Sequence, residues 1–450
     1  MRFWLPIALA AGVALVYAYR RAANAGFARK ARWGAAALAA AAFWAFIFWA
    51  FSRAQGAREG AHVATVTTSL LAILIAIPVI LYRWLADVLP LRRRRFWLLA
   101  STAGLLVLAM AGSAAIRRPD VSAGAVTLYV AVSLILWAFA VSAVPIGVLR
   151  AVVALVARRR QPAPRSAEVR APDLTRRQVV EGLGGAAILT WTGGAFAWGA
   201  ARGRFDVQLE ERIVRVPGLS RALDGYTIAQ ISDIHGGPLL DEDVLARGLA
   251  LLKRARPDLI VATGDLVDDD ARFAPRLARA LADLQARDGV FAILGNHDYY
   301  AGAQRVVQAV SAAGVRMLVN DGVAVRPGEG GGFALLGVDD AWGPRAGGAG
   351  PDLEAALRAV PGDAPKVLLS HQPDTVERFA GRVALQLSGH THGGQLNPGF
   401  VPARMVTPYV AGRYDVRGTT LYVNRGLGTT GLPSRIGAAP EITRIVLVSG

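Results

Sequence analysis

The sequence predicts an N-terminal α-helical transmembrane bundle followed by an α/β domain. Hydrophobic residues make up 53% of the 450-residue chain. The mean hydropathy of +0.36 is too high for an ordinary soluble protein. Apolar runs of membrane-spanning length occur before residue 150. From Phe205 onward, short apolar runs alternate with stretches rich in Ala, Leu and Arg, which is typical of alternating strands and helices.

The predicted membrane domain covers residues 1–157. A transmembrane helix needs about 20 consecutive apolar residues. Five runs have this length or nearly so, at residues 3–19, 33–51, 63–82, 96–116 and 124–149. The first run is also compatible with a signal peptide, because residues 16–18 read Val-Tyr-Ala. We expect an uncleaved helix there, since four more runs follow.

The excess positive charge lies in the first half of the chain. Residues 1–204 contain 25 Lys and Arg but 6 Asp and Glu, a net charge of +19, whereas residues 205–450 have a net charge of −2. By the positive-inside rule, the basic loops are cytoplasmic and the N-terminus lies outside. These loops cover residues 20–32, 83–95 and 150–178. The second half lacks the basic surplus that nucleic-acid binding requires, so nucleic acid is an unexpected partner.

A linker rich in Pro, Ala and Arg is predicted over residues 158–178, and a sixth apolar segment over 179–204. Arg176 and Arg177 precede this segment, and Glu181 interrupts it. Two interpretations remain open: a weakly hydrophobic sixth span, or a twin-arginine-type signal anchor. Both interpretations place the domain over residues 205–450 outside the cytoplasm, at the cell membrane.

The α/β domain is predicted from eight buried strand-like runs and four helical stretches. The strands are expected at 226–232, 258–264, 289–295, 333–339, 366–371, 383–389, 420–426 and 444–449. The helices are expected near 241–256, 271–287, 302–313 and 351–360.

Residues of the types that bind metals follow five of these strands. They are Asp233, His235, Asp265, Asp268, Asn296, His297, Asp298, His371, His390 and His392. Five of the six histidines of the chain belong to this set. Ligands bind at the carboxyl ends of strands in open α/β sheets, so we expect these side chains to form one site.

The ligand types narrow the choice of metal. The chain contains no cysteine, which excludes thiolate zinc sites, cysteine nucleophiles and disulfides. Carboxylates, imidazoles and an amide oxygen suit divalent Mn, Fe, Ni or Zn better than Ca.

The order of these motifs resembles the calcineurin-like metallophosphoesterase family. The resemblance rests on Asp-x-His, Gly-Asp-x-x-Asp, Gly-Asn-His-Asp, a lone His and Gly-His-x-His, and it covers residues 225–450. "GHTHGGQ" and the tail at 424–442 resemble the bacterial, often membrane-anchored subgroup that includes the YaeI and YkuE phosphodiesterases. The resemblance implies two mixed β-sheets sandwiched by helices and a dinuclear metal centre.

The resemblance also implies a role for each residue. Asp233, His235 and His392 would bind one metal ion. Asn296, His371 and His390 would bind the other, and Asp265 would bridge the two. His297 would act at the leaving group, while Asp268 and Asp298 would orient ligands without binding metal.

The expected activity is a membrane-tethered phosphoesterase that hydrolyses phosphodiesters or phosphomonoesters by metal-activated hydroxide attack. A lipid-linked or envelope phosphate is the expected substrate, because tethering raises its local concentration. One alternative is a lipid-precursor hydrolase resembling UDP-2,3-diacylglucosamine pyrophosphatase, which would require a cytoplasmic domain. Another is a transporter or sensor that a phosphoesterase domain regulates, although the predicted spans carry almost no internal charge. A nuclease is disfavoured by the charge of the second half.

Overall fold

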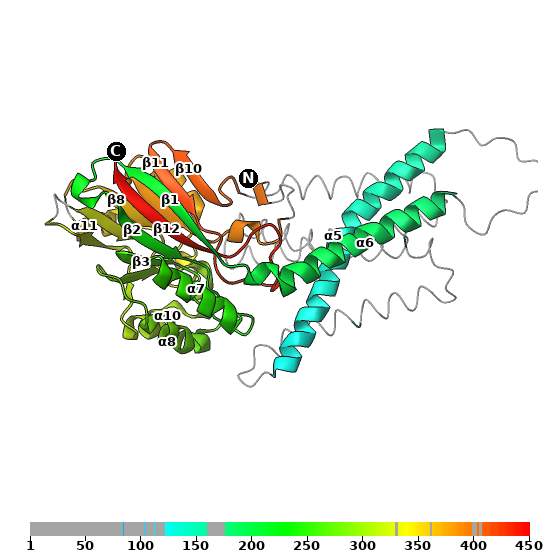
Figure 1. The fold of residues 1–450 in the computed structure, drawn as a ribbon, viewed down its shortest axis with the longest axis horizontal. Coiled ribbons are helices and arrows are strands. Elements are labelled where there is room, and N and C mark those ends of the chain that lie inside the picture. Colours follow the sequence, from blue (N-terminus) through cyan, green and yellow to red (C-terminus); the bar gives the residue numbers. More distant parts are fainter. Residues whose placement is uncertain are drawn as a thin grey trace, which may run out of the picture. The chain divides into compact units, whose positions relative to one another are not determined.

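The structure is a computed structural model (Figure 1). It describes residues 84, 104, 112, 122–159, 176–328, 332–360, 362–397, 403–404 and 407–450. The predicted spans at 3–19 and 33–51 lie outside these residues, as do 63–82 and nearly all of 96–116. The predicted linker lies outside them between residues 160 and 175.

The fifth predicted span corresponds to helix α5, Ala123–Arg159. Among the described helices, α5 alone is long and apolar enough to cross a membrane, over residues 124–157. The sixth apolar segment is also a continuous helix, α6, Arg176–Ala201. Glu181 of α6 is buried and pairs with Arg177 at 2.7 Å and with Arg150 of α5 at 3.5 Å. The use of α6 as a span or signal anchor stays a prediction.

Two six-stranded sheets form the centre of the α/β domain. The first has the order β1 (Gln208–Val216), β12 (Glu441–Ser449), β2 (Tyr226–Ile231), β3 (Leu259–Thr263), β4 (Val290–Ile293) and β5 (Arg316–Met317). The second has the order β10 (Gly412–Val416), β11 (Thr419–Val423), β9 (Leu385–Ser388), β8 (Lys366–Leu369), β7 (Phe333–Gly337) and β6 (Asp321–Val325). Both sheets are mixed, because β12 runs antiparallel to β2, and β10 and β6 run antiparallel to their neighbours. The expectation of two mixed sheets is confirmed.

Each central strand is buried on both faces because its side chains alternate between two cores. In β2, Tyr226 and Ile228 face the core between the sheets, whereas Ala229 and Ile231 face the helices. This double burial produces the continuous apolar runs seen in the sequence.

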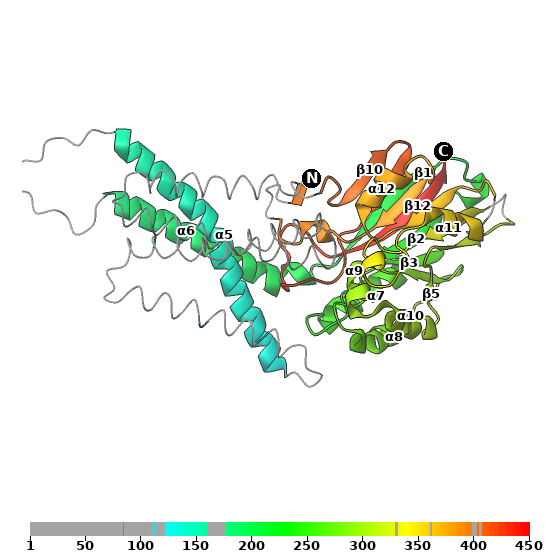
Figure 2. The ribbon, with the colours of Figure 1, turned by 180° about the vertical axis from the view of Figure 1, so that it is seen from behind.

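Helices cover the outer face of each sheet (Figures 1 and 2). On the first sheet these are α7 (Glu242–Arg254), α8 (Ala274–Ala282) and α10 (Ala303–Ala312). On the second sheet these are α11 (Leu353–Ala359) and α12 (Val376–Phe379). The start of α7 is fixed by Asp241, whose side chain accepts a hydrogen bond from the backbone N–H of Asp243.

All eight predicted strands and four predicted helices correspond to elements of the structure. The sequence analysis missed β1, β5, β6, β10 and the short helices α9 (Asn296–Ala301) and α12. β1 was missed because it reads QLEERIVRV and lies at the edge of its sheet, with most of its side chains exposed.

Candidate metal centre

The ten residues singled out in the sequence follow strands from both sheets. Asp233 and His235 follow β2, Asp265 and Asp268 follow β3, and residues 296–298 begin α9 after β4. His371 follows β8, while His390 and His392 follow β9. Five of these residues have left-handed backbone conformations: Asp233, His235, Asp265, His390 and His392, with φ between 48° and 72°. Such strain in residues other than glycine is concentrated at functional sites.

One group of potential ligands consists of Asp233, His235 and His392. The Nε2 atoms of His235 and His392 lie 3.0 Å apart, and Nε2 of His392 lies 3.3 Å from Oδ1 of Asp233. All three residues are buried. Their ligand atoms are close enough together to hold one metal ion.

A second group consists of Asp265, His371 and His390. Nε2 of His371 lies 3.2 Å from Oδ2 of Asp265 and 3.2 Å from Nδ1 of His390. These three residues are also close enough to hold an ion. The same Oδ2 atom of Asp265 lies 3.6 Å from Nε2 of His235, so this carboxylate stands between the two groups.

Asn296 contributes an amide oxygen that has no hydrogen-bond partner. Asn296 is buried, and its Nδ2 donates to Oη of Tyr300 at 3.2 Å, while its Oδ1 is unpartnered. A buried acceptor without a donor is costly. A cation would satisfy it, and a site of imidazoles, carboxylates and one such oxygen fits a divalent transition metal.

His297 and Asp268 lie together at the edge of the first group. The backbone N–H of His297 donates to Oδ1 of Asp265 at 2.8 Å. Oδ1 of Asp268 lies 3.2 Å from Nδ1 of His297 and 3.2 Å from Nδ1 of His235. Side-chain atoms of His235, Asp265 and His297 also approach closely enough to form a third possible metal group.

Asp298 holds two loops of the site in place. Its Oδ1 accepts from the backbone N–H of Val267 at 3.0 Å, and its Oδ2 accepts from that of Gly295 at 2.9 Å. Asp298 therefore joins the loop after β3 to the loop after β4. Its oxygens face backbone donors, away from a ligand position.

Two glycines allow the loops to approach the carboxylates. A Cβ atom added to Gly389 would lie 2.2 Å from Oδ2 of Asp233 and 1.9 Å from Oγ of Ser232. A Cβ atom added to Gly295 would lie 2.2 Å from Oδ1 of Asp265. All three distances are shorter than any van der Waals contact, so these positions require glycine.

The comparisons with known proteins agree with this geometry. Residues 226–394 match the family model described as calcineurin-like phosphoesterase. An uncharacterized metallophosphoesterase of Bacillus subtilis, YkuE, is 31% identical over 286 residues, which is 61% of this chain and 98% of that protein. An uncharacterized metallophosphoesterase of Aquifex aeolicus is 34% identical over 226 residues, which is 50% of this chain and 85% of that protein.

The chain belongs to the calcineurin-like metallophosphoesterase family. Its catalytic domain is accordingly that of a metal-dependent phosphoric ester hydrolase.

A third relative, from zebrafish, is named a transmembrane protein with metallophosphoesterase domain. It is 35% identical over 243 residues, which is 52% of this chain. The match spans 56% of that protein, little more than half its length. The name of this relative and the apolar helix α5 both favour association of this chain with a membrane.

Burial and nearby charges shift the pKa values of the histidines of the metallophosphoesterase site in two directions: the pKa is raised for His371 and His297 and lowered for His390. Burial lowers the pKa of His371, but Asp265 and Asp233 outweigh it and raise the pKa well above its usual value. Burial also opposes protonation of His297, yet its hydrogen bond to Asp268 raises its pKa overall. Burial, reinforced by the positive charge of His371, lowers the pKa of His390 to about 4.

The pKa values of the carboxyl groups are also shifted in two directions. Burial raises the pKa of Asp233. Burial also acts to raise the pKa of Asp265, but the charge of His371 and its hydrogen bond outweigh burial and lower it. Burial, together with the negative charge of Asp265, raises the pKa of Asp298 to about 7.

The sequence analysis missed Asp340 and Arg435. Asp340 is 2% exposed, and its Oδ2 has no hydrogen-bond partner. Burial raises its pKa to about 6. It follows the predicted strand at 333–339, so the strand-end rule used for the other residues could have found it. Arg435 is buried and lies against His392, and no local pattern signals that position.

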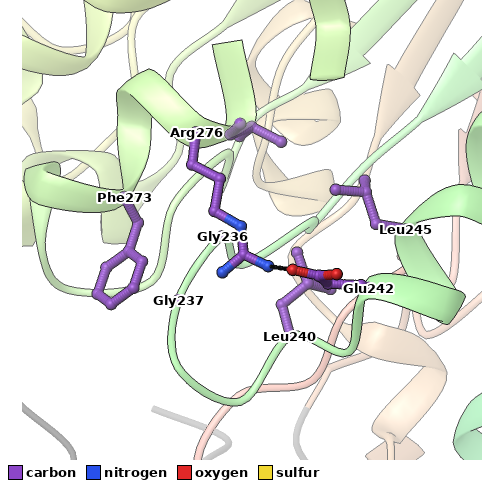
Figure 3. A pocket seen from close by; sticks show the side chains of 8 residues that line it. Gly236, Gly237, Leu240, Glu242, Leu245, Phe273 and Arg276 are labelled. Atoms are coloured by element: carbon purple, nitrogen blue, oxygen red, sulfur yellow. Dashed lines mark hydrogen bonds and ion pairs between the residues drawn. The ribbon is translucent and has the colours of Figure 1, made fainter. Parts of the chain in front are cut away.

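A small pocket begins at Gly236 and Gly237, directly after His235 (Figure 3). Its lining is mainly apolar, with Leu240, Leu245, Phe273 and Leu277 contributing side chains. The ion pair between Arg276 and Glu242 closes one side. None of the candidate metal ligands lines this pocket, so it lies beside the metallophosphoesterase site without being its substrate cleft.

Proposed function

We propose that this protein is a membrane-anchored phosphoesterase that hydrolyses phosphodiester or phosphomonoester bonds with two divalent metal ions. The observation that carries the proposal is the position of Asp265 between two ligand groups, with one oxygen 3.2 Å from His371 and 3.6 Å from His235. A carboxylate in this position suits two ions better than one.

In this proposal each metal ion has its own ligands. Asp233, His235 and His392 would hold the first ion. His371, His390 and Oδ1 of Asn296 would hold the second, and Asp265 would be shared by both groups. When bound, divalent Mn, Fe, Ni or Zn would supply Lewis acidity and make water a nucleophile at neutral pH.

Asp268 orients two histidines at once. It faces Nδ1 of both His235 and His297. When Nδ1 of His235 donates its proton to this carboxylate, Nε2 of His235 keeps a lone pair that could bind the first ion. In the same way, the contact between Asp268 and Nδ1 of His297 would direct Nε2 of His297 toward the reacting group.

His297 is the proposed general acid. Its hydrogen bond to Asp268 raises its pKa above the usual value, which favours the protonated form, and a protonated Nε2 can donate to the departing oxygen. Its backbone N–H bond to Asp265 fixes the donor relative to the ligands.

The proposed location is the cell membrane, with several spans and an extracytoplasmic catalytic domain. The basic loops of the first half support this orientation. A tethered site meets lipid-linked or envelope phosphates at a high effective concentration, which supports them as the substrate class.

Hydrolysis of bis-p-nitrophenyl phosphate by the full chain in detergent tests the proposal. The protein is stripped of metal and reconstituted with each divalent ion in turn. We expect Asp265→Ala and His390→Ala to lose hydrolysis while circular dichroism stays unchanged. Asp321→Ala, which removes a half-exposed carboxylate that pairs with Arg316, is the matched control. A fully active Asp265→Ala variant would contradict the assignment.

A further inference from the structure

A row of aromatic rings leads from the proposed acid to the surface. The rings of His297 and Tyr300 have centroids 5.0 Å apart at an angle of 61°. The rings of Tyr300 and Trp342 follow at 5.2 Å and 90°. Tyr300 is 45% exposed, although it stands one helical turn from the buried ligand Asn296. The row therefore borders the side of the site from which His297 would protonate a leaving group.

Trp342 is held in this row by buried carboxylates. Its backbone N–H donates to Oδ1 of Asp340 at 2.7 Å. Asp339 accepts from Oη of Tyr299 at 2.5 Å and from the backbone N–H of Gly350 at 2.9 Å. The loop over residues 340–350 is thereby tied to α9, which carries His297 and Tyr300. These hydrogen bonds hold Trp342 beside Tyr300.

The two ends of the row have different chemistry. At the inner end, Oη of Tyr300 accepts from Nδ2 of Asn296, which turns the amide oxygen of Asn296 away from the phenol. At the outer end, the guanidinium of Arg345 lies over the ring of Trp342 at 4.9 Å. The exposed part of Tyr300 lies between these ends and is open to a ligand.

We propose that Tyr300 and Trp342 form the leaving-group subsite, and that it favours esters whose leaving group carries a planar aromatic ring. This inference rests on the proposed function, because His297 defines the leaving-group side. Rings that already meet edge to face offer a third ring the same geometry, and aromatic pairs of this kind favour binding by about 2- to 12-fold. An aliphatic leaving group would also bury apolar area against these two rings, but it would not gain the edge-to-face interaction of an aromatic ring.

Two phosphonates that differ only in their ring test the subsite. Phenylphosphonate and cyclohexylphosphonate carry the same head group and a six-carbon ring. Isothermal titration measures their binding to the full chain in detergent, loaded with manganese, without turnover. We expect the wild-type protein to bind the phenyl compound about 3- to 10-fold more tightly.

Trp342→Leu should bring this ratio close to one while leaving the affinity for cyclohexylphosphonate within about 2-fold. Trp191→Leu is the matched control, because it makes the same substitution at a tryptophan of α6 that is 62% exposed, and it should keep the wild-type ratio. Tyr300→Phe keeps the ring and should keep the ratio while lowering kcat, because Asn296 loses its partner.

Equal wild-type binding of the two phosphonates would overturn the subsite, and so would a Trp342→Leu variant that weakens both alike. Binding of inorganic phosphate distinguishes failure of the aromatic subsite from failure of the proposed function. Metal-dependent phosphate binding without ring preference refutes the subsite alone. A lack of metal-dependent phosphate binding together with a lack of hydrolysis refutes the proposed function, and the subsite falls with it.

Discussion

Nη2 of Arg435 lies 3.2 Å from Nδ1 of His392. Arg435 is 1% exposed, and its other donors reach backbone carbonyls, including those of Arg425 at 2.7 Å and Gly428 at 3.0 Å. Burial lowers its pKa to about 9, so the guanidinium is still charged at neutral pH. One buried cation thus joins the segment 425–438 to a candidate metal ligand.

Arg435→Met should weaken the first metal group more than the second. It leaves several buried carbonyls without donors, for which we expect a loss of about 3 kcal/mol in the free energy of unfolding. Metal analysis should give about one ion per chain in place of two. Arg413→Met, at a half-exposed arginine paired with Asp415, is the control and should retain both ions. Equal loss of both ions would contradict a specific role through His392.

His297→Ala should retain metal and lose rate. Removing a general acid costs about 10²- to 10⁴-fold. The loss should grow as the leaving group becomes more basic, because a good leaving group departs without a proton. Rates for a series of substituted phenyl phosphates, measured beside metal content, check this expectation. Loss of a metal ion in this variant would instead assign His297 to the third group that it forms with His235 and Asp265.

Gly389→Ala should disable the first ligand group. The added Cβ would lie 2.2 Å from Oδ2 of Asp233, so the carboxylate or the loop has to move. We expect a metal affinity at least about 10-fold weaker, as for other changes that misplace a ligand. Gly418→Ala is a useful comparison, because Gly418 has φ of 84° but open space around it. If Gly389→Ala binds metal no worse than Gly418→Ala does, the close approach of the backbone to Asp233 is not the reason for glycine at position 389.

Metal binding should release protons, and more of them at low pH. The raised pKa of His371 keeps it protonated in the metal-free protein at neutral pH, and Nε2 must lose its proton to bind an ion. His390, with its pKa near 4, adds no proton at neutral pH. Metal affinity should therefore fall as the pH falls below neutral. Titration calorimetry in two buffers of different ionisation enthalpy counts the protons, and the release of no proton at neutral pH would refute the assignment.

Protonation also affects the stability of the metal-free protein in two directions. The raised pKa of His371 stabilises the fold below about pH 6.5, and this contribution disappears as the pH rises through the folded-state pKa. The lowered pKa of His390 acts oppositely, since its contribution is present above about pH 6.5 and is lost as the pH falls toward 4.

A reporter fused after residue 450 should reveal an extracytoplasmic location. The expected orientation follows from the basic loops, which stay on the cytoplasmic side. Alkaline phosphatase, which is active only outside the cytoplasm, should be active in the fusion. Green fluorescent protein serves as the opposite reporter, and fluorescence without phosphatase activity would reverse the proposed topology.

The strand-end residues were predictable because their positions follow from chain order. Each buried strand is a continuous apolar run, and a run that ends in Asp-x-His or Gly-His-x-His marks the sheet edge where side chains converge. His371 and His390, 19 residues apart in sequence, meet at 3.2 Å for this reason.

Contacts made by irregular segments were not predictable in this way. Arg435 lies in a stretch with no regular secondary structure, and most of its partners are backbone carbonyls, which no side-chain pattern encodes. Trp342 reaches Tyr300 through a loop whose conformation depends on Asp339 and Asp340. β1 has the polar surface of an edge strand, which resembles a loop in sequence.

The position of β12 between β1 and β2 sets the order in which the protein can be made. β1 pairs with β12 along its whole length, from Gln208 with Glu441 to Val216 with Ser449. More than 200 residues separate the two strands, and at about 5–20 residues per second the ribosome needs tens of seconds to cover that distance. During this time β1 lacks its neighbour, while the segments before residue 205 have already left the ribosome. The first sheet is therefore completed only at the end of synthesis, although its edge strand β1 is made at the start of the catalytic domain.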